Sequence, residues 1–191
     1  MKYCCYCGGV TVVRIPEKDD RERFVCSVCE IVHYQNPNVV AGCIPVLDER
    51  VLLCRRAIEP RSGLWTLPAG FMELGETTME AAVRETLEEA NARVSLQNLY
   101  VVLNLPHVDQ VYMMFRARLL DMDFFPGVES TEVRLFAEPE IPWASLAFRT
   151  IEITLEYYFA DRRDGRFPLR IGDVIKSGSE FELRRGPSET V

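Results

Sequence analysis

The sequence lacks the long apolar segments that would place it in a membrane. No run of 18 apolar residues occurs in the 191-residue chain, so we expect no membrane-spanning helix. The first residues also lack a basic stretch followed by an apolar one, which argues against a secretory signal. These absences favour a cytoplasmic protein that has no membrane partner.

An excess of positive charge is also missing. Lysine and arginine total 22, whereas aspartate and glutamate total 29, which gives a net charge of −7 at pH 7. A chain of this kind lacks the positive field that captures phosphate polymers, so broad nucleic-acid binding is disfavoured. With 48% hydrophobic residues, the chain can bury a core, and its length fits one ordinary domain plus a small appendage.

The seven cysteines are an odd number, and four of them form two Cys-x2-Cys pairs. Without a leader, this usage suggests a reducing compartment and metal ligation rather than disulfides. The pairs are separated by 18 residues, which suits a structural zinc site with four thiolate ligands. The expected ligands are Cys4, Cys7, Cys26 and Cys29.

Other residues near these pairs leave alternatives open. Cys5 does not fit the Cys-x2-Cys spacing and is expected not to bind the metal, whereas His33 could compete as a ligand. The alternative to a zinc site is a redox-active cysteine pair or a chance clustering of cysteines. We expect a zinc ribbon over residues 1–36, with the charged run at 17–23 as a hairpin tip. Five basic and five acidic side chains balance in this segment, so nucleic-acid binding by the ribbon has no support from charge.

The remaining chain alternates predicted strands and helices. Apolar runs at 39–47 and 50–56 predict a hairpin, and residues 99–105 with 111–119 predict another strand pair. A short strand is expected at 133–137, and helical periodicity covers 145–161. This order predicts a mixed sheet with helices on its faces, an α/β (α+β) fold, over residues 37–175. Residues 176–191 read as a polar, mobile tail.

An acidic pattern surrounds the first predicted helix. Thr77 and Glu80 fit a capping box, and the helix is expected to end near Asn91. Glu85, Glu88 and Glu89 are spaced by three and four residues, so they share one helix face. Crowded carboxylates suit a hard divalent cation, Mg²⁺ or Mn²⁺. The alternative is a solvated acidic helix face.

The complete pattern resembles the Nudix box, Gly-x5-Glu-x7-Arg-Glu-U-x-Glu-Glu-x-Gly-U, in which U is a bulky aliphatic residue. Six of its seven fixed letters match, and Asn91 stands at the last glycine, where its tolerance of a left-handed helix end makes the departure mild. The matching residues are Gly70, Glu76, Arg84, Glu85, Glu88 and Glu89. The resemblance implies a Nudix α/β/α sandwich.

The resemblance also implies roles for these residues. Glu85 and Glu89 would be the main metal ligands, with Glu88 assisting or acting as base, and a carbonyl of Ala69 or Gly70 would add a ligand. Arg84 would orient the glutamates, and Glu76 would be structural. Many Nudix proteins supply one more carboxylate from a later loop. Here Glu132 aligns best and Glu129 second, although either could be an ordinary exposed glutamate.

A ribbon followed by this box resembles NADH pyrophosphatases. Those enzymes usually carry a Ser-Gln-Pro-Trp-Pro-Phe-Pro motif, which is absent here; the stretches 126–130, 134–137 and 142–148 look closer to plant chloroplast-type Nudix hydrolases that cleave FAD and ADP-ribose. The resemblance therefore implies hydrolysis of a nucleoside diphosphate linked to a second moiety, X, giving AMP and X-phosphate. Alternatives are an NADH or capped-RNA pyrophosphatase, a non-catalytic ADP-ribose sensor and a zinc-ribbon nucleic-acid adaptor.

Four side chains are candidates for substrate contact, and Glu129 is one of them. Phe71 and Tyr112 could stack on adenine or flavin, although both also suit a core position. His107 lies on a predicted loop and could reach the substrate. A homodimer is implied only by analogy with the family.

Overall fold

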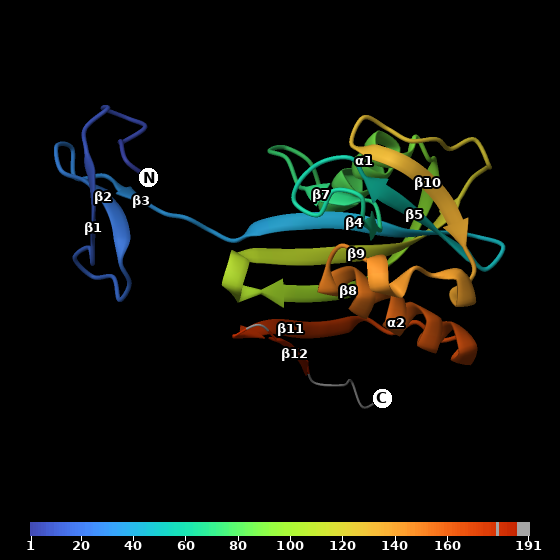
Figure 1. Cartoon of the computed structure of the whole chain (residues 1–191). Helices are drawn as coiled ribbons and strands as arrows, with labels where there is room; N and C mark the ends of the chain where they lie inside the picture. The colour runs from blue at the N-terminus through green and yellow to red at the C-terminus, as the bar shows by residue number, and fades with distance from the viewer. Residues whose placement is uncertain (179, 187–191) are drawn as a thin grey trace. The chain divides into compact units, whose positions relative to one another are not determined.

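The computed structural model describes residues 1–178 and 180–186, and the chain divides into two units, Met1–Pro37 and Asn38–Val191 (Figure 1). This boundary lies one residue from the predicted end of the ribbon. In the described part of the chain, no helix is both long enough and apolar enough to cross a bilayer.

The first unit, whose residues are all described, contains three antiparallel strands: β1 (Thr11–Arg14), β2 (Arg23–Cys26) and β3 (Val32–His33). The charged run at 17–23 joins β1 to β2, as the sequence predicted. Few apolar side chains are buried here, because Cys4, Val25 and Cys26 are its only hydrophobic residues below a tenth exposed. A unit with so small a core needs another source of stability, such as a bound metal.

The second unit is built on one mixed sheet, which has nine strands among the described residues. The hairpin of β4 (Asn38–Leu47) and β5 (Arg50–Arg56) confirms the first predicted strand pair. The strand β4 runs parallel to β9 (Gln110–Leu119), which pairs antiparallel with β8 (Val94–Leu105) through the short 3-10 turn η1 (Pro106–Val108). The remaining strands are β6 (Trp65–Thr66), β7 (Ala69–Phe71), β10 (Ser130–Phe136), β11 (Arg170–Ser177) and β12 (Glu180–Arg185).

The helix α1 (Thr78–Ala90) begins and ends where the sequence predicted. The Thr77 hydroxyl accepts a hydrogen bond from the Glu80 backbone N–H, and the Glu80 carboxylate accepts one from the Thr77 N–H, so the capping box is complete. Asn91 closes the helix in the left-handed region, at φ 48°. The asparagine therefore supplies the conformation for which the Nudix pattern uses glycine.

The two long helices cover opposite faces of the sheet. Side chains alternate along β4, where Cys43 packs with Ala81 and Ala82 of α1, and Ile44 packs with the core under the second helix, α2 (Arg149–Asp164). The alternation confirms the predicted α/β/α sandwich, whose layers are visible in Figure 1.

The second helix starts later than predicted. Residues 145–161 showed helical periodicity, yet Trp143–Ser145 form a 3-10 turn, η3, and α2 begins at Arg149 and is closed by Gly165 at φ 66°. The reason lies in the backbone, because the Ala147 N–H donates to the Trp65 carbonyl at 2.8 Å. This bond ties the preceding segment to β6 and holds it extended.

The predicted mobile tail is partly a strand. The hairpin of β11 and β12 extends the sheet, with β11 parallel to β8. Residues 176–177 and 180–185, which the sequence placed in a polar tail, are therefore strand. Charged side chains are common on sheet edges, so the polar composition did not reveal the hairpin. Positions 179 and 187–191 lie outside the described residues.

Candidate active site

Arg84 fastens the loop before α1 to the helix itself. Its Nη2 donates to the Glu76 carboxylate at 2.7 Å and to the Phe71 carbonyl at 3.0 Å. Its Nη1 donates to Glu85 at 2.6 Å and to Glu88 at 3.1 Å. Arg84 therefore links Glu76 of the loop to two glutamates of the helix, and the roles expected of Arg84 and Glu76 stay predictions. The pairing with Arg84 lowers the pKa of Glu76.

Gly70 gives the Glu85 carboxylate room against the loop. A Cβ built on Gly70 would lie 2.3 Å from the carboxyl carbon and both oxygens of Glu85. No other residue could stand there without moving Glu85. The glycine of the box is therefore required by close approach.

Glu89 is the most buried carboxylate of the three, with 7% of its surface exposed. Its Oε2 is buried and has no hydrogen-bond partner among the described residues. Burial raises the pKa of Glu89 to about 8, and the charge of Glu85 adds to the shift, while Arg56 opposes it. An unsatisfied buried carboxylate oxygen is costly, so this atom is suited to a ligand that is a cation.

The three glutamates open onto a cleft of about 810 Å³ that lies entirely in the second unit. The cleft is lined by glutamates, here called the acidic wall, and also by Arg56, Tyr112 and Phe148. Ile58, Phe71 and Val128 add apolar surface. Among the described residues, six glutamates but only two arginines line the cleft: Glu59, Glu73, Glu85, Glu88, Glu89 and Glu129, with Arg56 and Arg84.

The later loop brings Glu129, rather than Glu132, to the cleft. The charge of Glu129 raises the pKa of both Glu85 and Glu89, although burial is the larger cause for each. Glu132 is instead half-exposed on β10, where its carboxylate lies 3.6 Å from Arg55 Nη1. The structure therefore reverses the predicted order of these two candidates. The strand register, which places Glu132 opposite Arg55, was not readable from the sequence.

The segment before Glu129 is bound to the C-terminal end of α1. The Phe125 and Gly127 N–H groups donate to the carbonyls of Ala90 and Glu89, and the Asn91 side-chain amide donates to the Phe125 carbonyl. These bonds satisfy helix-end carbonyls that would otherwise lack a partner. They also fix the loop that carries Glu129 relative to the acidic helix.

Of the residues predicted to contact substrate, some line the cleft and one does not. Phe71 and Tyr112 both line the cleft, although Tyr112 is also packed against the core. His107 is not among the lining residues: its ring lies 5.5 Å from that of Phe181 on β12. Sequence reasoning missed Arg56 and Phe148. Phe148 was counted with the apolar face of the predicted helix, and the strand pattern at 50–56 does not say which arginine faces the cleft.

The residues of the acidic wall fit a hard divalent cation. Their donors are oxygens only, one of them is the orphaned Glu89 Oε2, and Gly70 keeps the loop backbone beside Glu85. The carboxylates of Glu85 and Glu88 do not converge on a single point, because the Arg84 guanidinium bridges them.

The four predicted thiols gather in the ribbon. Their Sγ atoms all lie within 4.8 Å of one another, and both Cys7–Cys26 and Cys7–Cys29 are 3.4 Å apart. Backbone N–H groups of Cys29 and Val28 donate to Cys26 Sγ and lower its pKa to about 6. The cluster therefore has the composition and spacing of a four-thiolate metal site.

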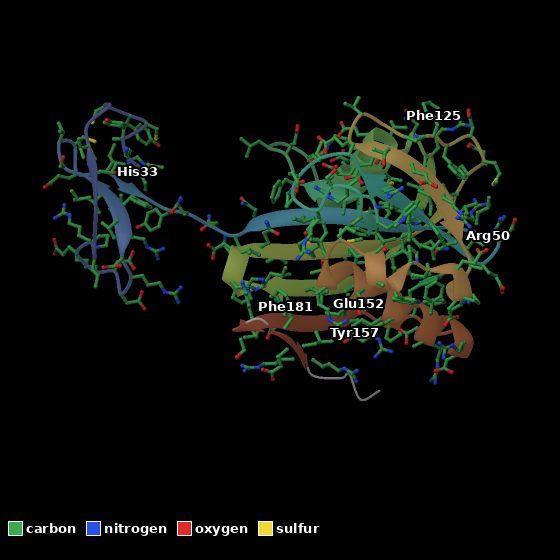
Figure 2. All side chains as sticks on the ribbon, in the orientation of Figure 1. His33, Arg50, Phe125, Glu152, Tyr157 and Phe181 are labelled. Carbon is green, nitrogen blue, oxygen red and sulfur yellow. The ribbon has the colours of Figure 1, made fainter. Side chains whose placement is uncertain are left out.

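Two neighbours of this cluster stand apart from it. Cys5 is exposed, and its Sγ lies 3.8 Å from Nδ1 of His33, which is buried in the ribbon (Figure 2). The structure therefore keeps both residues outside the four-thiolate group, as expected for Cys5. Cys43 and Cys54 are buried in the second unit, where both pack in its hydrophobic core.

Comparison with known families matches both units. Residues 36–153 match the NUDIX domain, and residues 2–35 match the Nudix N-terminal zinc ribbon. This chain belongs to the Nudix family. Its Nudix domain carries the acidic helix and the cleft, and its ribbon carries the cysteines.

Relatives of this Nudix chain include proteins of two names. An NAD-capped RNA hydrolase of Photorhabdus laumondii is 35% identical over 108 residues, which cover 55% of this chain and 38% of that protein. An ADP-ribose pyrophosphatase of Methanocaldococcus jannaschii is 30% identical over 128 residues, which cover 65% of this chain and 75% of the other. The chain thus matches well under half the length of the first relative.

A solved structure matches nearly the whole Nudix chain. The crystal structure of a NUDIX hydrolase from Nitrosomonas europaea superposes with a TM-score of 0.90 at 56% identity, covering 92% of this chain and all of that one. The fold is therefore shared well beyond the box itself.

Proposed function

We propose that the chain is a metal-dependent pyrophosphohydrolase that cleaves a nucleoside diphosphate linked to X into AMP and X-phosphate. One observation carries this proposal: an oxygen-only acidic wall, with the orphaned Oε2 of Glu89 in it, faces a cleft of about 810 Å³. A cavity of this size suits a dinucleotide-like ligand.

Mg²⁺ or Mn²⁺, when bound, would neutralise the diphosphate and lower the pKa of a coordinated water. Glu85 and Glu89 would hold the cation, with Glu88, Glu129 and a carbonyl of the 69–70 loop as further oxygens. Arg84 keeps Glu85 and Glu88 in place. It would not contact the substrate, because its N–H donors already bind protein oxygens. Glu88 is more exposed than Glu85 and Glu89 and is the candidate base.

ADP-ribose and FAD are the preferred substrates. The absent Ser-Gln-Pro-Trp-Pro-Phe-Pro motif argues against NADH, and a relative named an ADP-ribose pyrophosphatase covers more of this chain than the RNA hydrolase does. Phe71 and Tyr112 would contact the base across the cleft. The charges at this site also suit a diphosphate diester better than a triphosphate, because only two arginines among the described lining residues offset six glutamates.

The second candidate is hydrolysis of NADH or NAD-capped RNA. It is supported by the relative named for that activity and by the resemblance of a ribbon followed by the Nudix box to NADH pyrophosphatases. The ribbon itself would be structural, with zinc held by Cys4, Cys7, Cys26 and Cys29. A homodimer stays a prediction from family analogy.

The test is a Mg²⁺-dependent screen of FAD, ADP-ribose, NADH, NAD-capped RNA and nucleoside triphosphates with product identification. We expect AMP and X-phosphate from ADP-ribose or FAD. In parallel, Glu85→Gln and Glu89→Gln should each abolish turnover and leave the melting temperature nearly unchanged. Glutamine is isosteric with the protonated Glu89 that a pKa near 8 implies at neutral pH. Persistent activity in both variants would remove the metal assignment.

A further inference from the structure

Arg56 is a cationic side chain of the cleft that forms no ion pair with a described residue of the protein. It stands at the end of β5 and lines the cleft together with the acidic wall. The other cation of the lining, Arg84, is occupied by three carboxylates and a carbonyl. In the described part of the chain, Arg56 has no carboxylate within ion-pairing distance, 4 Å.

The guanidinium of Arg56 is nevertheless held in place. Its Nε donates to the Pro60 carbonyl at 2.9 Å, and its central carbon lies 5.2 Å from the centre of the Phe148 ring. Stacking on an aromatic face restrains the plane of a guanidinium, and the Nε bond restrains its rotation. The Nη1 and Nη2 groups make no hydrogen bond to any described residue, so a planar fork of N–H donors remains for a ligand.

A phosphate is the ligand that this fork matches. Two parallel N–H donors bind two oxygens of one phosphate, with both charge and geometry in their favour. Glutamates line the same cleft, so a substrate bound there would carry anionic groups that contact Arg56 and a cation that the glutamates hold. We propose that Arg56 binds a phosphate of the substrate's diphosphate bridge, with Phe148 as its support. This rests on the proposed function.

A structural role is the main competing explanation. Arg56 affects Glu89 electrostatically, because its charge lowers the pKa of that carboxyl. Were Arg56 only a counter-ion for the acidic wall, its removal would change cation binding and would have no specific effect on phosphate. The two roles therefore differ in which ligand they influence.

The neighbouring residue provides a matched control. Arg55 is also an arginine of β5, and its Nε also donates to a carbonyl of the following loop, that of Gly63, at 2.8 Å. It is paired with Glu132 outside the cleft. Arg55→Gln thus removes the same charge from the same strand without touching the cleft.

The experiment titrates inorganic pyrophosphate with Mg²⁺ into the full-length protein by calorimetry, in wild type, Arg56→Gln, Arg56→Lys and Arg55→Gln. We expect Arg56→Gln to weaken pyrophosphate binding about ten- to hundredfold, the range for a charged hydrogen bond. Arg56→Lys should recover part of the loss, since it restores charge but not the fork. Arg55→Gln should bind as wild type, and all variants should keep the wild-type melting temperature.

A second titration uses Mn²⁺ alone, followed by electron paramagnetic resonance. The Mn²⁺ affinity should be nearly the same in Arg56→Gln as in wild type. A change in Mn²⁺ affinity, in either direction, as large as the change for pyrophosphate would overturn the proposal in favour of the counter-ion role. Pyrophosphate affinity within twofold of wild type in Arg56→Gln would overturn it as well.

The steady-state kinetics separate this proposal from the proposed function. With ADP-ribose, Arg56→Gln should raise KM more than it lowers kcat. If the wild type hydrolyses ADP-ribose and Arg56→Gln does so with the same kinetics, the Arg56 assignment alone is overturned. Arg56-dependent pyrophosphate binding in a protein that hydrolyses none of the nucleotides supports the phosphate site and refutes the proposed function.

Discussion

Replacing Gly70 with alanine should damage the site while leaving the fold intact. The added Cβ would lie 2.3 Å from three atoms of the Glu85 carboxyl group, whereas ordinary contact begins near 3.4 Å. The carboxylate must therefore move by about 1.1 Å. Gly70 does not occupy the left-handed region, so alanine adds no backbone strain there.

The displacement falls on a flexible side chain, so its cost in stability should be small. We expect the free energy of unfolding to change by less than about 1 kcal/mol, because surrounding backbone need not shift. Misplacing a catalytic group by about 1 Å can cost roughly 100-fold in rate, which corresponds to about 2.7 kcal/mol of transition-state stabilisation. Turnover of ADP-ribose at saturating Mg²⁺ should fall by that order.

The matched control is Gly127→Ala. A Cβ at Gly127 would lie 1.7 Å from the carbonyl oxygen of Glu88, which is backbone and cannot move cheaply. This variant should lose about 1–3 kcal/mol of stability or more. Chemical denaturation and steady-state rates measured on both variants test the reasoning. Gly70→Ala with wild-type turnover, or with a stability loss equal to that of Gly127→Ala, would refute it.

Three further predictions concern the ribbon, the core and the cleft. Metal analysis of the purified chain should find one zinc per molecule, and Cys4→Ser should release it and unfold the ribbon; a zinc-free wild type would end the ribbon assignment. Tyr100 donates to the buried Asp161 carboxylate at 2.6 Å, so Tyr100→Phe should cost about 1.5–3 kcal/mol in denaturant unfolding. Burial raises the pKa of Tyr100 above its ordinary value near 10, so wild-type stability should be complete below pH 10 and decline above it, and Tyr100→Phe should lack this decline. Glu129→Gln should reduce turnover, whereas Glu132→Gln should leave it unchanged in the same assay. The opposite result would make Glu132 the later-loop carboxylate of the site, as the sequence suggested.

Local signals in the sequence predicted the elements that depend on local chemistry. The capping box of Thr77 and Glu80 and the left-handed Asn91 mark both ends of α1 within single residues. Continuous apolar runs located β4 and β5 with nearly their observed bounds. Spacing along α1 and between the Cys-x2-Cys pairs identified groups of side chains that the structure then brings together.

The failures arise where distant segments decide the outcome. The start of α2 is delayed because Ala147 bonds to Trp65, more than 80 residues earlier in the chain. The strand β12 exists because β11 offers it an edge, and β11 depends on β8. The position of Glu132 follows from its pairing with β5. In the same way, only the folded sheet reveals that Arg56 rather than Arg55 faces the cleft.

The bonds between the 125–127 segment and the end of α1 have a consequence for engineering. A designer who wishes to alter substrate choice by transplanting the loop around Glu129 from a relative would also be replacing the cap of α1. Phe125 and Gly127 must therefore travel with any graft, together with a residue at position 91 that can keep the side-chain bond. A shorter exchange, confined to 128–129, is the cut that leaves the helix end intact.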